Sequence, residues 1–195
     1  MKYFFMGIVL SVLYFVFIFD NSEKNFTSSD TFEPKQFSSS IDDFKHNNDF
    51  IITPKYSYEI QARVLSKKGY SDFNSKIAPY DLALGWDEMS LNVNTNKIDI
   101  WQRKRWYFWQ SDNMPIKRRL IELNSANHHI IHKDDFVKDK MSEVEENDIV
   151  YLKGYLVNVK SLSNKSWYWN SSTSRTDVGD GACEVFFVED IKIIK

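Results

Sequence analysis

The chain has 195 residues, of which 43% are hydrophobic, 16% aromatic and 27% charged, and its formal net charge is -2 at pH 7. This balance excludes a disordered tail, and the counts of 6 Gly, 4 Pro and 1 Cys exclude a collagen-like repeat and a small disulfide-stapled scaffold. With 25 Lys and Arg against 27 Asp and Glu, there is no global positive field of the kind that draws a small protein onto nucleic acid. We therefore expect one globular domain with appendages and no nucleic-acid partner.

An uncharged hydrophobic run opens the chain over residues 3–19. As a helix it would extend about 25 Å, at the short end of what crosses the hydrocarbon core of a bilayer. Bulky residues end the run where signal peptidase needs small ones, so we expect residues 1–20 to be an uncleaved transmembrane anchor, with a cleaved signal peptide as the alternative. Because Lys2 precedes the run, the positive-inside rule places the rest of the chain outside the cytoplasm of a bacterial cell, either periplasmic or extracellular.

The composition changes after the hydrophobic run. Residues 21–55 are rich in Ser, Asp, Asn and Lys, with scattered Phe and no stable period of 2 or 3.6. Such a composition is typical of a flexible tether. The remaining residues, 56–195, are numerous enough to form one hydrophobic core.

Three strands are the first elements that the pattern predicts in this domain. Apolar and polar residues alternate over residues 56–64, which is typical of a half-buried strand. A long connection follows over residues 66–96, with a short helix expected at residues 80–84. We place the second strand at residues 97–109 and the third at residues 116–124.

A helix and two further strands complete the domain. Apolar residues at helical spacing predict a helix that begins at Asp134 or Asp135 and ends near Val144. Strands are predicted at residues 149–159 and 184–194, with a second long connection between them. The order strand, long loop, strand, strand, helix, strand, long loop, strand is that of an oligonucleotide/oligosaccharide-binding (OB) barrel, whose ligands meet the loops after strands one and four. The predicted fold class is therefore mainly β (α+β), a small OB-like five-stranded barrel with one helix between strands three and four. An antiparallel sandwich with one helix is the alternative.

The predicted second strand alternates arginine with aromatic residues. Alternate residues of a regular strand share a face, and guanidinium groups and aromatic rings stack on sugars and bases. This pattern predicts a ligand-binding face. The alternative is that the rings pack beneath the long loops and the arginines pair with the acidic helix. The residues of this Trp/Arg face are Trp101, Arg103, Arg105, Tyr107 and Trp109.

The loop after the fourth strand is the second candidate ligand-binding segment. Trp167 and Trp169 supply flat rings, and Arg175 and Asp177 supply charge. We expect these residues to contact the same ligand as the Trp/Arg face. An ion pair between Arg175 and Asp177 that fixes a turn is the simpler alternative.

Metal binding has weak support in the sequence. Asp177, Asp180 and Glu184 carry the oxygen ligands that calcium and magnesium prefer, but their spacing is not that of the twelve-residue calcium loop. His128 and His129 point to opposite faces of an extended chain, which disfavours a zinc site. We therefore predict no metal and no other cofactor.

Cys183 is the only cysteine and suggests an alternative function. A cysteine and a histidine within hydrogen-bond reach, oriented by a third group, can carry out nucleophilic acyl transfer. Cys183 with His129, oriented by Asn127 or Asp177, would then form a hydrolase or transferase that acts in the cell envelope. A small buried thiol at the start of a strand is the simpler interpretation.

Four segments of the chain resemble an uncharacterised group of bacterial membrane-anchored or exported proteins. The last segment, S-R-T-D-V-G-D-G-A-C-E, is the most specific, and His129 occupies the characteristic position of the third. The resemblance implies a bacterial, extracytoplasmic location and no particular reaction. The segments are residues 79–86, 105–109, 125–129 and 174–184.

Taken together, these features predict a membrane-tethered binding or scaffold domain rather than an enzyme. Its partner would be an envelope glycan, a peptide or another envelope protein, held by the Trp/Arg face and the two long loops. Residues 3–19 would connect the domain to the membrane.

Overall fold

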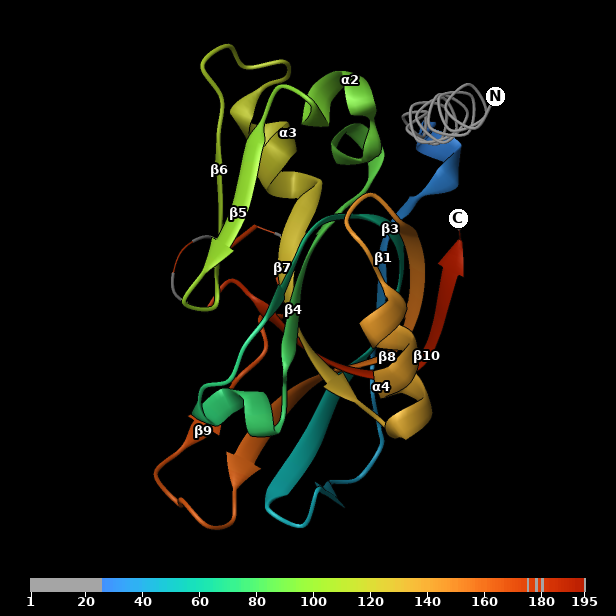
Figure 1. Cartoon of the computed structure of the whole chain (residues 1–195). Coiled ribbons are helices and arrows are strands. Elements are labelled where there is room, and N and C mark those ends of the chain that lie inside the picture. The colour runs from blue at the N-terminus through green and yellow to red at the C-terminus, as the bar shows by residue number, and fades with distance from the viewer. Residues whose placement is uncertain (1–25, 175, 178, 180, 195) are drawn as a thin grey trace, which may run out of the picture.

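The structure is a computed structural model that describes residues 26–174, 176–177, 179 and 181–194 (Figure 1). The predicted anchor over residues 1–20 lies outside the described residues, as do Arg175 and Asp180. Among the residues that are described, no helix is long and apolar enough to cross a membrane.

The described part of the chain is mainly β. The strands are β1 Phe32–Ser38, β2 Phe44–His46, β3 Phe50–Gly69, β4 Tyr80–Gly85, β5 Asp99–Arg103, β6 Trp106–Gln110, β7 Ser125–His132, β8 Ile149–Ser161, β9 Tyr168–Trp169 and β10 Glu184–Ile194. The α-helices are α2 Asn92–Thr95, α3 Arg118–Leu123 and α4 Asp135–Glu143, and the 3-10 helices are η1 Ser28–Asp30, η2 Phe73–Lys76 and η3 Asp87–Ser90.

Five of these strands pair in a circuit. Strand β3 pairs with β4, β4 with β7, β7 with β10, β10 with β8, and β8 again with β3. Only the β7–β10 pair of this circuit is parallel. Strand β3 is 20 residues long, and each of its two circuit ladders carries a register shift. Strands β1, β2 and β9 extend the edges of the same sheet.

The largest apolar cluster lies within this circuit. Tyr58, Ile60 and Ala62 alternate along β3 and are almost completely buried in that cluster. Helix α4 adds Val137 and Met141 to the cluster. Full burial of side chains of this size stabilises the fold by about 1.5–3 kcal/mol each.

Several sequence predictions are confirmed. The predicted strands at residues 56–64, 149–159 and 184–194 correspond to β3, β8 and β10. The predicted helix corresponds to α4, which Asp134 caps by accepting a hydrogen bond of 3.0 Å from the backbone N–H of Val137.

The prediction of a helix over residues 80–84 is wrong, because this segment is strand β4. Leu82 and Leu84 pack in the largest cluster, and Asp81, on the opposite face of the strand, is equally buried. A strand that is buried on both faces lacks the period of 2, so its apolar run resembles a short helix.

The prediction of one strand over residues 97–109 is also wrong. This segment forms most of a hairpin of two strands, β5 and β6, which pair with each other and not with the circuit. Lys104 and Arg105 form the turn with φ angles of 53° and 71°. Glycine or asparagine is typical of such positions, and their absence concealed the turn.

The predicted third strand over residues 116–124 is largely helix α3, and β7 follows it. Arg118 and Glu122 form an ion pair at helical spacing, and Ile121 is buried on the inner face of the helix. Residues 86–124 therefore form an insertion between two circuit strands, β4 and β7.

The predicted tether over residues 21–55 also differs from the structure over residues 26–55, the part of it that is described. Strands β1 and β2 lie in this segment, and both pair with β3, which itself begins at Phe50. Burial alternates along β1, but the partly buried positions include Gln36 and the exposed ones include Phe37, so the sequence itself has no apolar and polar alternation and resembles a linker.

Candidate binding site between the hairpin and the sheet

Two neighbouring cavities lie along the β5–β6 hairpin. The first has a volume of about 450 Å³ and the second about 490 Å³. Trp106, Gly179 and Cys183 line both, so the cavities adjoin. We call this pair of cavities the binding site.

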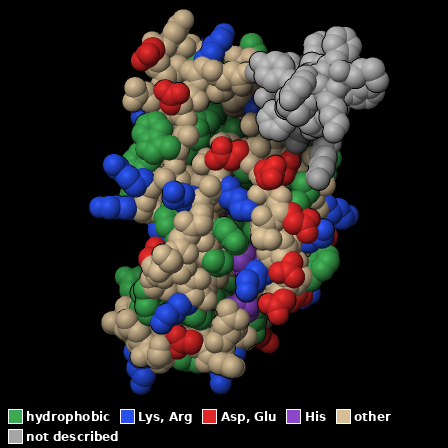
Figure 2. Space-filling model, viewed as in Figure 1, with side chains coloured by type: hydrophobic (Ala, Val, Ile, Leu, Met, Phe, Trp, Pro, Cys, Tyr) green, Lys and Arg blue, Asp and Glu red, His purple; other side chains and the backbone are tan. Residues whose placement is uncertain are grey.

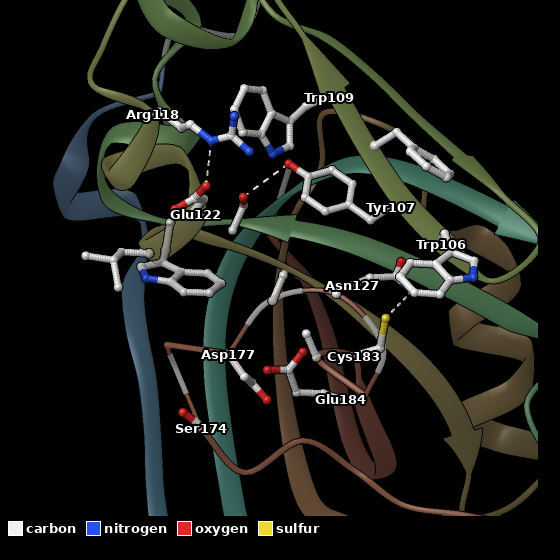
Figure 3. A pocket seen from close by; sticks show the side chains of 17 residues that line it. Trp106, Tyr107, Trp109, Arg118, Glu122, Asn127, Ser174, Asp177, Cys183 and Glu184 are labelled. Atoms are coloured by element: carbon white, nitrogen blue, oxygen red, sulfur yellow. Dashed lines mark hydrogen bonds and ion pairs between the residues drawn. The ribbon is translucent and has the colours of Figure 1, made fainter.

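Aromatic side chains of the hairpin form one wall of the first cavity. Figure 3 shows Tyr107 and Trp109 above the cavity and Asp177 below it, with Trp106 at one side. The hydroxyl group of Tyr107 donates a hydrogen bond of 3.1 Å to Ser125, and burial raises the pKa of Tyr107 to about 12. The wall is therefore built from neutral rings that are held in place.

Polar side chains surround these rings. Arg118 lies over the ring of Trp109, with its guanidinium carbon 5.4 Å from the centroid, and donates a hydrogen bond of 2.8 Å to Glu122. The hydrogen bond from Arg118 holds the pKa of Glu122 below its ordinary value. Across the cavity, Asp177 accepts a hydrogen bond of 2.7 Å from Ser172.

The Trp/Arg face predicted from the sequence is not formed as one surface. In the hairpin register Trp101 lies opposite Phe108 and Arg103 lies opposite Trp106, so these four residues share one face. Tyr107 therefore lies on the other face, as does Trp109. The rings of Trp101 and Phe108 stack with centroids 5.6 Å apart. Hydrophobic side chains gather at the edge of the molecule where the hairpin lies (Figure 2).

Arg105 lines the second cavity, but its guanidinium group is largely buried and bonded to other parts of the protein. Its guanidinium donates to both carboxylate oxygens of Asp72, to Asp81 at 2.9 Å and to the carbonyl oxygen of Ala78 at 2.8 Å. It also lies 4.0 Å from the ring centroid of Tyr70. These bonds fasten the turn of the hairpin to the sheet, and they hold the pKa of Asp72 below its ordinary value.

A chain of hydrogen bonds forms the floor between the two cavities. Gln102 donates a bond of 2.6 Å to the side-chain oxygen of Asn127. The Asn127 amide donates in turn to the carbonyl oxygen of Arg105 at 3.3 Å and to Cys183 Sγ at 3.6 Å. Burial raises the pKa of Cys183 to about 12, so the thiol is protonated at neutral pH.

The predicted Cys183–His129 pair lines the second cavity, but the two side chains bond to other groups. Cys183 Sγ interacts with Asn127 and the Arg105 carbonyl, whereas His129 Nδ1 lies 2.9 Å from Asp81 Oδ1. Within the described part of the chain no hydrogen bond joins the sulfur to the imidazole. The arrangement is that of a half-buried thiol beside a separate histidine–carboxylate pair.

The two predicted tryptophans of the loop have different positions. Trp169 lines the second cavity, and its ring centroid lies 4.4 Å from that of His129. Trp167 instead packs against Phe50 and donates a hydrogen bond of 3.2 Å to Asn74. Among the described residues, no group of three or more His, Cys, Asp or Glu side chains is placed to hold a metal ion.

Sequence reasoning missed Trp106, which lines both cavities, and Asp81, which is bonded to His129 beside the second cavity. Of the two, the sequence carried a signal for Asp81. It is a single carboxylate within the apolar segment Tyr80–Gly85, and it is fully buried. Asp is almost never fully buried without a partner. An acidic residue inside an apolar run was therefore the available signal.

Comparison with family models, with curated proteins and with solved structures finds no match to this chain.

Proposed function

We propose that this chain is a glycan-binding domain of the bacterial cell envelope, in which the two adjoining cavities hold consecutive units of an extended sugar polymer. The observation that carries the proposal is the shared wall of the cavities at Trp106, Gly179 and Cys183. Two neighbouring compartments joined in this way suit a chain of repeating units better than one compact molecule.

The chemistry of the walls supports a sugar ligand. A pyranose ring has apolar C–H faces that pack on aromatic rings and hydroxyl groups that need donors and acceptors. The first cavity offers the rings of Trp106, Tyr107 and Trp109 together with the polar groups of Asn127 and Asp177. The aromatic groups provide contact area, and the polar groups provide orientation.

The strand order supports an OB-like barrel as the scaffold. The five-strand circuit has its helix, α4, between the third and fourth circuit strands, and its third and fifth strands are parallel. We propose that this circuit is an OB-like five-stranded barrel. In barrels of this class, ligands bind across the second and third strands and the loops after strands one and four. The binding site lies beside β7 and the connection from β8 to β10, which fits this rule.

We further propose that residues 3–19 anchor the chain in the bacterial cytoplasmic membrane and hold the domain in the periplasm or outside the cell. The support is the uncharged hydrophobic run and the position of Lys2 before it. A domain in this location meets envelope polysaccharides.

The alternative, a Cys183–His129 hydrolase or transferase, has less support. A nucleophilic thiol needs a lowered pKa and an adjacent base. The pKa of Cys183 is instead raised to about 12, and the sulfur interacts with Asn127 and a backbone carbonyl.

Titration with soluble oligosaccharides tests the proposal. The full-length chain in detergent micelles would be titrated with hexamers of glucose, N-acetylglucosamine and galacturonic acid, with calorimetry as the measurement. We expect at least one hexamer to bind, and Trp106→Ala to weaken its binding about tenfold, the loss typical of one stacking contact.

A matched control is available in the same hairpin. Trp101 is as exposed as Trp106, at 39%, but it lines neither cavity. Trp101→Ala should therefore leave binding unchanged. If no hexamer binds, or if the two variants weaken binding equally, the proposed site is wrong. If a peptide or an envelope protein binds and no hexamer does, the ligand of the site is that peptide or protein and not a glycan.

A further inference from the structure

Asp81 and His129 form a buried polar pair beside the second cavity. They are opposite each other in the β4–β7 ladder, and His129 Nδ1 lies 2.9 Å from Asp81 Oδ1. Asp81 is completely buried and His129 is 3% exposed. Because both residues lie on strands of the circuit, the sheet fixes their relative position.

The other ring nitrogen of His129, Nε2, has no hydrogen-bond partner among the described residues. His129 lines the second cavity. The geometry therefore leaves Nε2 as the ring nitrogen that remains for a ligand in that cavity.

The environment of Asp81 determines which ring nitrogen carries the proton. Arg105 donates a hydrogen bond of 2.9 Å to Asp81 Oδ1, the same oxygen that faces Nδ1 of His129. This oxygen is an acceptor, so Nδ1 of His129 is the donor toward it. Nε2 of the neutral ring then presents a lone pair to the cavity.

We propose that Nε2 of His129 accepts a hydrogen bond from a hydroxyl group of the sugar unit in the second cavity, with Asp81 as the positioning residue. This inference rests on the proposed glycan-binding function. Trp169 lines the same cavity next to the imidazole, so the sugar that donates to Nε2 also contacts the indole ring. The His129–Asp81 pair thus favours sugars that carry a hydroxyl group at the position of the pyranose ring that faces Nε2.

The variant His129→Asn separates this role from a structural one. The asparagine amide can take the place of Nδ1 and donate to Asp81, but nothing replaces Nε2. We expect the unfolding transition to stay close to that of the wild type and the Kd for the best-binding hexamer to rise about tenfold, since a lost partner leaves a buried ligand group unsatisfied. His46→Asn, in β2 and outside both cavities, is the control and should not change Kd.

A measurement on the wild-type protein gives a second test. The ¹⁵N shifts of the ring nitrogens report the tautomer, and we expect the proton of neutral His129 on Nδ1, with a shift change at Nε2 when the hexamer is added. A proton on Nε2 overturns the assignment. If the wild type binds a hexamer and His129→Asn binds it equally well, this inference fails while the glycan-binding function stands. If no hexamer binds the wild type, both fail.

Discussion

Arg105, in the turn of the β5–β6 hairpin, donates a hydrogen bond of 2.9 Å to Asp81, which is completely buried in β4. This bond joins an inserted hairpin to a strand of the five-strand circuit. The hairpin supplies the aromatic wall of the binding site. The shape of the site therefore depends on the contact between Arg105, which lines the second cavity, and Asp81, which lines neither cavity.

Removal of the Arg105 guanidinium should destabilise the fold strongly. Arg105→Met keeps most of the aliphatic stem but leaves the buried carboxylate of Asp81 with one partner fewer. Loss of one member of a buried ion pair typically costs about 3–5 kcal/mol, and we expect the free energy of unfolding in urea to fall by about 3 kcal/mol.

Arg118→Met is the control for this experiment. Its ion pair with Glu122 is at the surface, with the Arg118 side chain 76% exposed. Exposed pairs contribute less than about 1 kcal/mol, so this variant should unfold almost like the wild type. Equal losses in the two variants would contradict the role assigned to Arg105.

The pH dependence of stability should reveal the Arg105–Asp72 bond. Folding lowers the pKa of Asp72 from its ordinary value of 3.8, chiefly through the hydrogen bond from Arg105. A group with a depressed pKa contributes stability above its unfolded-state pKa and loses that contribution as the pH falls through the folded-state pKa. The wild type should therefore lose stability relative to Asp72→Asn as the pH is lowered from about 5 to about 2. A difference between the two proteins that does not change over this range would argue against the bond.

The thiol of Cys183 should react slowly in the folded protein. Its pKa of about 12 leaves little thiolate near neutral pH, although the side chain is only half-buried. We expect alkylation by iodoacetamide to be slower by about a thousandfold than in the urea-unfolded chain, because the rate follows the thiolate fraction. Mass spectrometry of the alkylated protein over time measures both rates. Rapid reaction in the folded state would favour the alternative function, a hydrolase or transferase that uses Cys183 and His129.

A glycine in β8 provides a test of the strand circuit itself. A Cβ atom at Gly154 would lie 2.0 Å from the carbonyl oxygen of Phe187, where β8 meets β10. Gly154→Ala should therefore lower the free energy of unfolding by at least about 2 kcal/mol, because backbone must move to make room.

Gly69→Ala is the matched substitution at the end of β3. The nearest atom to its added Cβ is 3.6 Å away on the flexible Tyr80 side chain, an ordinary contact distance. We expect this variant to remain within about 0.5 kcal/mol of the wild type. If Gly154→Ala leaves the free energy of unfolding unchanged, β8 and β10 do not approach as closely as the circuit requires.

The elements that the sequence predicted well are those with a clear period. Strand β3 alternates over residues 56–64, and α4 has both helical spacing and a capping aspartate at Asp134. Strand β4 is buried on both faces and has no such period. The hairpin turn at Lys104 and Arg105 lacks a glycine, so its two strands resembled one.

The binding site was predictable in composition but not in arrangement. Trp169, Asp177 and Tyr107 were expected to contact a ligand, and each lines one of the two cavities. Asp81 could not be placed with His129, because their pairing depends on β4 and β7 being neighbours. That neighbour relationship comes from the tertiary fold and leaves no trace in local spacing.

The shared position of Trp106 has a thermodynamic consequence. The indole of Trp106 lines both cavities. Under the proposed function, a sugar unit in either cavity contacts this ring, so occupation of one cavity changes the surface that the other presents, and the coupling free energy is the same in both directions. The affinity of a monosaccharide for one cavity should then change when the other cavity is filled, and Trp106→Ala should remove that change.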